Sequence, residues 1–218
     1  GGTCPVEFAE LLYDCEDSFQ IKAASRIAFP DDFEDSETLF VGVVDEDPCS
    51  GPGGDVYYVV ETEATDLNIA GPEPGGGACV GDYPVDIISL DIKGTADDAE
   101  LIAGSWCNST VWYSYDGGWS WDASEKDPTG EEMTYVIWYE DTALAATAGC
   151  EAAVSQACVS DAVEDVGASW NQISLIDTHI DMVRWLGFSP GYLCEAGSET
   201  MYMVTYGEDC DDTVSVFR

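Results

Sequence analysis

Short apolar segments alternate along most of the chain with turns rich in glycine, proline and aspartate. Within these segments hydrophobic residues alternate with small or polar ones, or valine, isoleucine and tyrosine follow one another, as in strands covered on both faces. A helical pattern is confined to residues 6–13. The pattern therefore predicts an all-β fold. The predicted strands are residues 21–28, 38–44, 55–61, 86–92, 100–105, 110–114, 134–139, 144–149, 152–156, 180–185, 200–206 and 213–217.

Two segments of the sequence recur at spacings that agree with one repeat length. The segment Ser114–Trp121 returns in degraded form as Val163–Trp170, 49 residues later. The segment Ser36–Val41 returns as Ser198–Met203, displaced by 162 residues, which is three units of 54. A period of this size, with about four strands in each unit, is typical of the blades of a β-propeller.

The first of these segments carries a known motif. It fits the pattern S-x-D-x-G-x-x-W through Ser114, Asp116, Gly118 and Trp121. In this the chain resembles the Asp-box repeat family, which includes sialidase-like and sortilin-like propellers of secreted or cell-surface proteins. The resemblance extends from about residue 21 onward. The degraded second copy keeps Asp165, Gly167 and Trp170.

The resemblance implies a role for each residue of the box. In the family, the box forms the turn between the third and fourth strands of a blade. Its aspartate accepts hydrogen bonds from the turn, its glycine supplies a positive φ angle, and its tryptophan packs into the blade core. Because this turn lies at the blade periphery in the family, the resemblance gives Asp116 and Asp165 a structural role and not a catalytic one.

The same resemblance divides the chain into blades of four antiparallel strands, about three and three-quarter of them. Blade one lacks an Asp-box, because Val60 and Glu61 stand where the serine and its successor would be. A closed propeller has about 4 to 8 blades, so the chain is expected to be a fragment or a protomer that a partner completes. The expected ranges are 1–18 for an unexplained N-terminal segment, 19–71 for blade one, 72–83 for a Pro/Gly linker, 84–126 for blade two, 132–177 for blade three and 179–218 for the incomplete blade four.

Charge limits the classes of partner. The chain has 44 acidic and only six basic residues, and its formal net charge is -38. Nucleic acid and anionic membrane surfaces both require a basic face, so neither is an expected partner. No run of 18 apolar residues is present in the sequence, so direct membrane insertion is not expected. The expected partners are cations, neutral or amino-bearing polymers such as glycans, and other protein chains.

Nine cysteines are scattered along the chain without any C-x-x-C pair, and the single histidine, His179, has no cysteine close by. Zinc-ligand spacing is therefore absent. Scattered cysteines in a loop-rich chain predict disulfides and an oxidising, extracellular or cell-surface location. Pairing by proximity in the sequence leaves Cys107 over, either as a free thiol or with a partner in another chain or in a missing segment. The expected pairs are Cys4–Cys15, Cys49–Cys79, Cys150–Cys158 and Cys194–Cys210.

Acidic clusters in the predicted loops offer carboxylate oxygens to calcium, which takes six to eight of them. None of these loops fits the D-x-[DN]-x-[DN]-G pattern. No organic cofactor is expected, because the sequence has no P-loop and no G-x-G-x-x-G motif followed by a helix. The candidate calcium ligands are Asp45, Asp47 and Asp55 in one region, and Asp209, Asp211 and Asp212 in the other.

Aromatic residues allow a second interpretation, since flat rings stack on sugar faces. A sialidase clamps the substrate carboxylate with three arginines. Here the three are Arg26, Arg184 and Arg218, and the last follows an outer strand, so sialidase activity is not expected. The tryptophans expected to pack within blades are Trp112, Trp119, Trp121 and Trp170; the freer ones are Trp106, Trp138 and Trp185.

These observations favour a non-enzymatic module that is secreted or displayed on a cell surface. We expect it to contribute structure or interactions to a surface layer (S-layer), sheath or filament, through self-assembly or as part of a larger propeller, with calcium as a candidate ion. The alternative is a glycan-binding or glycoside hydrolase-like propeller, whose site would lie at the central channel.

Overall fold

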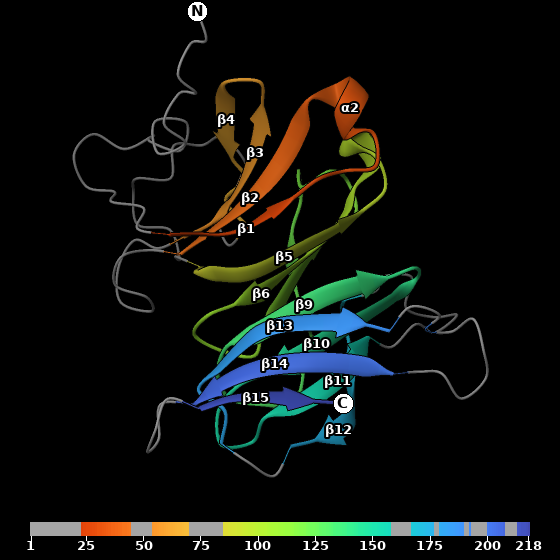
Figure 1. Ribbon diagram of the computed structural model, residues 1–218. Helices are drawn as coiled ribbons and strands as arrows, with labels where there is room; N and C mark the ends of the chain where they lie inside the picture. Colours follow the sequence, from red (N-terminus) through yellow and green to blue (C-terminus); the bar gives the residue numbers. More distant parts are fainter. Residues whose placement is uncertain are drawn as a thin grey trace, which may run out of the picture. The chain divides into compact units, whose positions relative to one another are not determined.

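The structure is a computed structural model that describes residues 23–44, 54–69, 85–157, 167–176, 179–189, 192, 200–207 and 213–218. Within these ranges the regular structure is β-sheet, apart from the four-residue helix α2 (Phe33–Ser36) and a 3-10 turn, η1 (Ala96–Asp98) (Figure 1). The all-β prediction is confirmed. The helical pattern at residues 6–13, the N-terminal segment 1–18 and the linker 72–83 lie outside the described residues.

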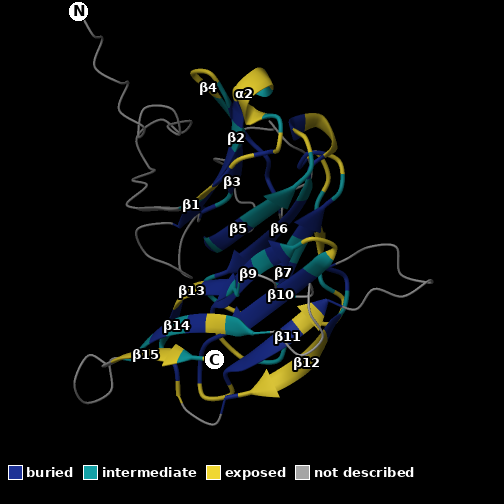
Figure 2. Ribbon diagram, turned by 45° about the vertical axis from the view of Figure 1, so that its right-hand side comes forward, coloured by how far each residue is buried: buried dark blue, intermediate teal, exposed yellow. Residues whose placement is uncertain are grey.

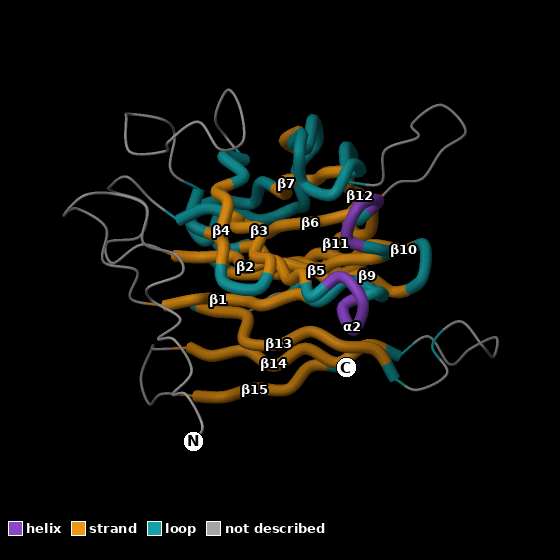
Figure 3. Tube along the Cα trace, turned by 90° about the horizontal axis from the view of Figure 1, so that it is seen from above, coloured by secondary structure: helices purple, strands orange, loops and turns teal. Residues whose placement is uncertain are grey.

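The strands form four antiparallel sheets in which each strand pairs with the next one along the chain. Figure 3 shows β13, β14 and β15 side by side. The first sheet is β1 (Ala23–Ala28), β2 (Thr38–Val44), β3 (Val56–Val60) and β4 (Glu63–Asp66); the second is β5 (Ile87–Lys93), β6 (Glu100–Ser105), β7 (Val111–Ser114) and β8 (Asp122–Ala123); the third is β9 (Thr134–Tyr139), β10 (Thr142–Thr147), β11 (Ala153–Ala157) and β12 (Trp170–Leu175); the fourth is β13 (Met182–Phe188), β14 (Met201–Gly207) and β15 (Thr213–Phe217). The four sheets fall within the four ranges expected to be blades.

The chain folds into two compact units. Unit 1 comprises residues 1–101 and 114–122, and unit 2 comprises residues 102–113 and 123–218. Inside unit 1, β5 packs beside β1 and β2; inside unit 2, β13 packs beside β9 and β10. Each unit therefore has its own hydrophobic interior. Fully buried side chains include Phe40, Val41, Val56, Leu67 and Leu101 in unit 1, and Leu144, Trp170 and Leu186 in unit 2.

The outer strands β4, β8 and β12 were not predicted from the sequence. Figure 2 shows the reason for β12, which is coloured as exposed along most of its length while β10 and β11 are buried. Five of the six residues of β12 are exposed, both residues of β8 are exposed, and β4 has one buried residue at its end. A strand at the edge of a sheet needs no continuous apolar run, so the hydrophobic pattern gives no signal for it.

The first and fourth sheets share a detailed feature of strand pairing. The register between β1 and β2 shifts between Ala24 and Arg26, and the register between β13 and β14 shifts between Val183 and Trp185. Each shift leaves one extra residue, Ser25 or Arg184, as a β-bulge. The partners of Ala24 and Val183 are Val43 and Thr205, which are 162 residues apart. The displacement of 162 residues between the repeated sequence segments therefore also separates equivalent positions in β2 and β14.

The apolar interior of unit 2 gives a stability prediction. Leu144, on β10, is completely buried, whereas Leu175, on the outer strand β12, is 60% exposed. We expect Leu144→Ala to lower the free energy of unfolding by about 2–5 kcal/mol, because it removes buried methyl groups and leaves a cavity. The matched substitution Leu175→Ala is expected to cost less than about 1 kcal/mol. Denaturant unfolding of both variants measures the difference, and equal losses would contradict the assigned core.

Candidate functional site

The segment Ser114–Trp121 is a tight turn that joins β7 to β8, the third and fourth strands of the second sheet. Gly117 and Gly118 have φ angles of 71° and 88°, a region that side chains disfavour. A Cβ atom on Gly118 would lie 2.7 Å from Cδ1 of Leu67. Glycine is therefore required at this position for both conformation and packing.

The carboxylate of Asp116 holds the turn together. Its Oδ1 accepts hydrogen bonds from the backbone N–H of Ser120 at 2.8 Å and from Oγ of Ser114 at 2.9 Å, and its Oδ2 accepts one from Oγ of Ser120 at 2.6 Å. Oγ of Ser114 also accepts from the N–H of Gly118 at 3.0 Å. Side-chain oxygens thus replace the backbone acceptors that a strand would supply.

These contacts keep Asp116 ionised. Partial burial acts to raise the pKa of Asp116, but hydrogen bonds from the side chain and backbone of Ser120, from the side chain of Ser114 and from the backbone of Trp119 outweigh it. The net effect is a pKa below the ordinary value of 3.8. A carboxylate stabilised as an anion by surrounding donors suits a structural role better than proton transfer at neutral pH.

A second turn in unit 2 repeats the contact between tryptophan and glycine. Nε1 of Trp121 donates to the carbonyl oxygen of Gly118 at 2.8 Å, and Nε1 of Trp170 donates to that of Gly167 at 2.9 Å. Gly167 has a φ angle of 127°. Asp165 lies outside the described residues. The two segments aligned in the sequence therefore share a local geometry, and the second also leads into a fourth strand, β12.

The tryptophans differ in burial. Trp170 is 1% exposed and forms part of the core of unit 2, whereas Trp121 is half-buried. Trp119 is 52% exposed, and its ring centroid lies 6.0 Å from that of Tyr58. The prediction that Trp119 packs in a blade was wrong, because its side chain leaves the turn toward solvent. Trp138, one of the three tryptophans outside the Asp-box positions, is buried.

Two acidic residues lie close together in unit 1. Oδ1 of Asp55 accepts from the N–H of Val56 at 2.6 Å and from the N–H of Ile69 at 3.1 Å. Burial raises the pKa of Asp55 well above 3.8, and the neighbouring charge of Asp66 raises it further, while the two backbone donors act in the opposite direction. Ionisation of the Asp55 carboxyl group is therefore unfavourable in the folded state.

Most of the candidate calcium ligands lie outside the described residues. Among the residues that it describes, no group of three or more histidine, cysteine or acidic side chains is arranged to hold a metal ion. Asp55 is the one candidate ligand within the described ranges. The other five candidates lie outside them: Asp45, Asp47, Asp209, Asp211 and Asp212.

The cysteine predictions need two corrections. Cys107, expected to be left over, is disulfide-bonded, with a partner outside the described residues. Cys150, expected to pair with Cys158, is free and exposed in the turn before β11. Proximity in the sequence was a poor guide because disulfides depend on the distance between Cβ atoms in the folded chain. The remaining cysteines lie outside the described residues: Cys4, Cys15, Cys49, Cys79, Cys158, Cys194 and Cys210.

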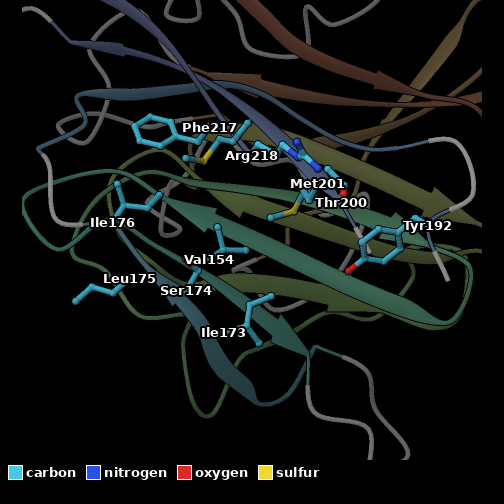
Figure 4. Close-up of a pocket in the computed structure, with 11 residues that line it drawn as sticks. Val154, Ile173, Ser174, Leu175, Ile176, Tyr192, Thr200, Met201, Phe217 and Arg218 are labelled. Atoms are coloured by element: carbon cyan, nitrogen blue, oxygen red, sulfur yellow. The ribbon is translucent and has the colours of Figure 1, made fainter. Parts of the chain in front are cut away.

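A groove in unit 2 was not predicted from the sequence. It has a volume of about 610 Å³ and is lined by residues of β11 and β12 and by residues of β14 and β15. Figure 4 shows side chains of β12 on one side of the groove and those of β14 and β15 on the other. The lining is largely apolar, and it includes Ile173, Leu175, Met203, Phe217 and the single charged side chain Arg218.

The strands around this groove differ from the rest of the chain in charge. The sequences of β12, β14 and β15 contain no aspartate or glutamate, although the chain has 44 acidic residues. Their exposed hydrophobic side chains include Ile173, Leu175, Tyr202, Val214 and Val216. The alternating sequence Thr-Val-Ser-Val-Phe predicted the strand β15, but not what its two faces contact.

Comparisons with models of known protein families and with curated protein sequences return no match for this chain. Among the described residues, no helix has the length and apolar character needed to cross a bilayer.

The Asp116 contacts predict a specific loss of stability. We expect Asp116→Ala to lower the free energy of unfolding at neutral pH by about 1–2 kcal/mol, because hydrogen bonds to an exposed anion are lost. Since the folded pKa is depressed, this stabilisation is present above pH 3.8 and disappears as the pH falls through the folded pKa. Asp122→Ala, an exposed change on β8, is the control, and unfolding curves from pH 7 to pH 2 measure both. A pH-independent difference would contradict the ionic role.

The raised pKa of Asp55 predicts the opposite dependence of stability on pH. A raised folded pKa means that the protonated form stabilises the fold, and that this stabilisation is lost as the pH rises from 3.8 through the folded pKa. Asp55→Asn keeps an acceptor for both backbone donors and removes the charge. We therefore expect its Tm in excess chelator to exceed that of the unmodified protein at pH 7 and to match it below pH 3.8. A lower Tm at pH 7 would show that the anion is required.

Proposed function

We propose that this chain is a non-enzymatic structural or interaction module that works by associating with other protein chains. The observation that carries the proposal is the apolar groove of unit 2, flanked by strands without acidic residues in a chain of net charge -38. Large exposed apolar surfaces on otherwise polar proteins mark interaction sites. An acidic protein can approach a like-charged partner most closely where it carries no acidic side chains.

We further propose that the four sheets are blades of an Asp-box type propeller. The sequential antiparallel pairing within each sheet supports this. So does the position of both glycine-tryptophan turns, one before β8 and one before β12, each the fourth strand of its sheet. In this proposal Asp116 is a structural residue, which agrees with the donors that surround its carboxylate.

An extracellular or cell-surface location forms part of the proposal. The disulfide at Cys107 supports an oxidising compartment. The acidic surface favours an environment with salt or divalent ions, which reduce the repulsion between carboxylates. A surface layer, sheath or filament would combine these conditions with repeated contacts between chains. Calcium held by the acidic residues outside the described ranges is the ion we propose for such contacts.

The native mass of the purified chain tests this function. We expect light scattering at moderate salt to give a mass above that of a 23.4 kDa monomer. If calcium joins the chains, an added chelator lowers the mass, since removing a bridging ion restores repulsion. A monomer at all concentrations, with and without chelator, would contradict the proposal. It would then favour glycan binding, with the exposed ring of Trp119 as the first surface to test.

A further inference from the structure

We infer that Asn108 carries an N-linked glycan, and this inference rests on the extracellular or cell-surface location that forms part of the proposed function. The residue opens the triplet Asn108-Ser109-Thr110, which fits the acceptor pattern N-x-[ST] with no proline at its second position. The chain contains three asparagines, and Asn68 and Asn171 do not open such a triplet. The acceptor pattern therefore selects one side chain.

The loop that carries Asn108 joins β6 to β7, which end and begin at Ser105 and Val111. The backbone N–H of Ser105 donates to the carbonyl oxygen of Thr110 at 3.4 Å and closes the loop. The carbonyl oxygen of Asn108 accepts from Oγ1 of Thr134 at 3.2 Å. The backbone of Asn108 is thus held in place, while the residue itself is exposed. A bulky, hydrophilic glycan can be accommodated on the folded chain only at such a position.

The side-chain amide of Asn108 has a defined orientation. Its Oδ1 accepts a hydrogen bond from the backbone N–H of Thr110 at 3.0 Å. Oxygen and nitrogen lie on opposite sides of the planar amide group, so Nδ2 points away from this N–H. The nitrogen that would carry the sugar is therefore not the atom that holds the loop together.

Attachment of the glycan is a group transfer. Nδ2 of Asn108 forms a bond to the anomeric carbon of an oligosaccharide that is linked through phosphate to a lipid. The bond between this carbon and the phosphate oxygen breaks, and the amide loses one proton. Nothing is oxidised or reduced, and the activated oligosaccharide is the only co-substrate.

The hydroxyl group at the third position of the triplet is available for this reaction. Oγ1 of Thr110 donates to Oδ2 of Asp127 at 3.3 Å, and the contact is exposed to solvent. A long, exposed hydrogen bond contributes little to stability, because water replaces it readily. Releasing this hydroxyl, or modifying the chain before the contact forms, therefore costs little.

The residue before Asn108 gives independent support for the compartment. Cys107 is disulfide-bonded. Disulfides form and persist mainly outside the reducing cytosol, and N-x-[ST] acceptors are used on surface loops of secreted proteins. Two neighbouring residues thus favour the same route through the cell for different chemical reasons.

Mass spectrometry of the protein from the cells that naturally produce it tests the modification. Trypsin, after reduction and alkylation, cuts after Lys93 and Lys126 and releases residues 94–126, in which Asn108 is the only asparagine. We expect this peptide to carry the mass of a glycan, and fragmentation to assign that mass to Asn108. A peptide found only in its unmodified form, or a sugar assigned to Ser109 or Thr110 instead, would overturn the inference.

Variants made in the same cells test the acceptor chemistry. We expect Asn108→Gln and Thr110→Val to lose the added mass completely, because one removes the acceptor and the other removes the hydroxyl group of the triplet. Thr110→Ser keeps that hydroxyl and is expected to keep the glycan. Asp127→Ala is the matched control, since it removes the contact to Thr110 without changing the triplet. Loss of the glycan in Asp127→Ala, or its retention in Asn108→Gln, would contradict the assigned site.

The state of Cys107 in the same peptide separates this inference from the proposed location. A glycan at Asn108 together with a disulfide at Cys107 supports both. A disulfide beside an unmodified Asn108 overturns the glycan and leaves the extracellular location. A free thiol beside an unmodified Asn108 overturns both.

Discussion

Backbone N–H and C=O groups at the edge of a small sheet require hydrogen-bond partners, and this requirement organises the described part of the chain. A sheet of three or four strands has two edge strands and only one or two interior strands, so a large share of its backbone groups lies at an edge. Here the outer strands β8 and β12 are short or polar and mostly exposed. The turns that lead into them are held by side chains such as that of Asp116 and also by backbone hydrogen bonds, from Gly117 to Ala99 before β8 and from Lys126 to Ala168 before β12. β15 differs, since its valines Val214 and Val216 are exposed.

The extreme charge of the chain acts differently on individual carboxyl groups. Asp116 lies among four donors in an exposed turn, and its ionisation stabilises the fold. Asp55 lies beside Asp66 in a poorly solvated position, and its ionisation destabilises the fold. Most of the other acidic residues that the structure describes are exposed, and their charge favours solubility and opposes contact. Regions without acidic residues are therefore the informative part of this surface.

Much of the fold could be predicted from the sequence, because strands covered on both faces leave a continuous apolar pattern. The predicted bounds of residues 38–44, 100–105, 134–139 and 213–217 are those of β2, β6, β9 and β15. The turn around Asp116 was also predictable, since its hydrogen bonds span only a few residues. β12 was not, because its sequence Trp-Asn-Gln-Ile-Ser-Leu is mostly exposed at an edge. The groove and the state of Cys107 and Cys150 depend on distances between remote segments, which a sequence pattern does not contain.

The β-bulge at Arg184 has a consequence for how this strand can change. Regular alternation would turn one of two consecutive side chains inward, but Arg184 and Trp185 are both exposed while Val183 and Leu186 on either side are buried. The extra residue thus interrupts the alternation of inward and outward side chains, and it keeps the guanidinium group of Arg184 out of the interior, where it would lack water. Deleting a single residue here would exchange the inward and outward sets along half of β13. Substitutions at this point are therefore easier to tolerate than insertions or deletions, and the length of the segment is constrained more tightly than its composition.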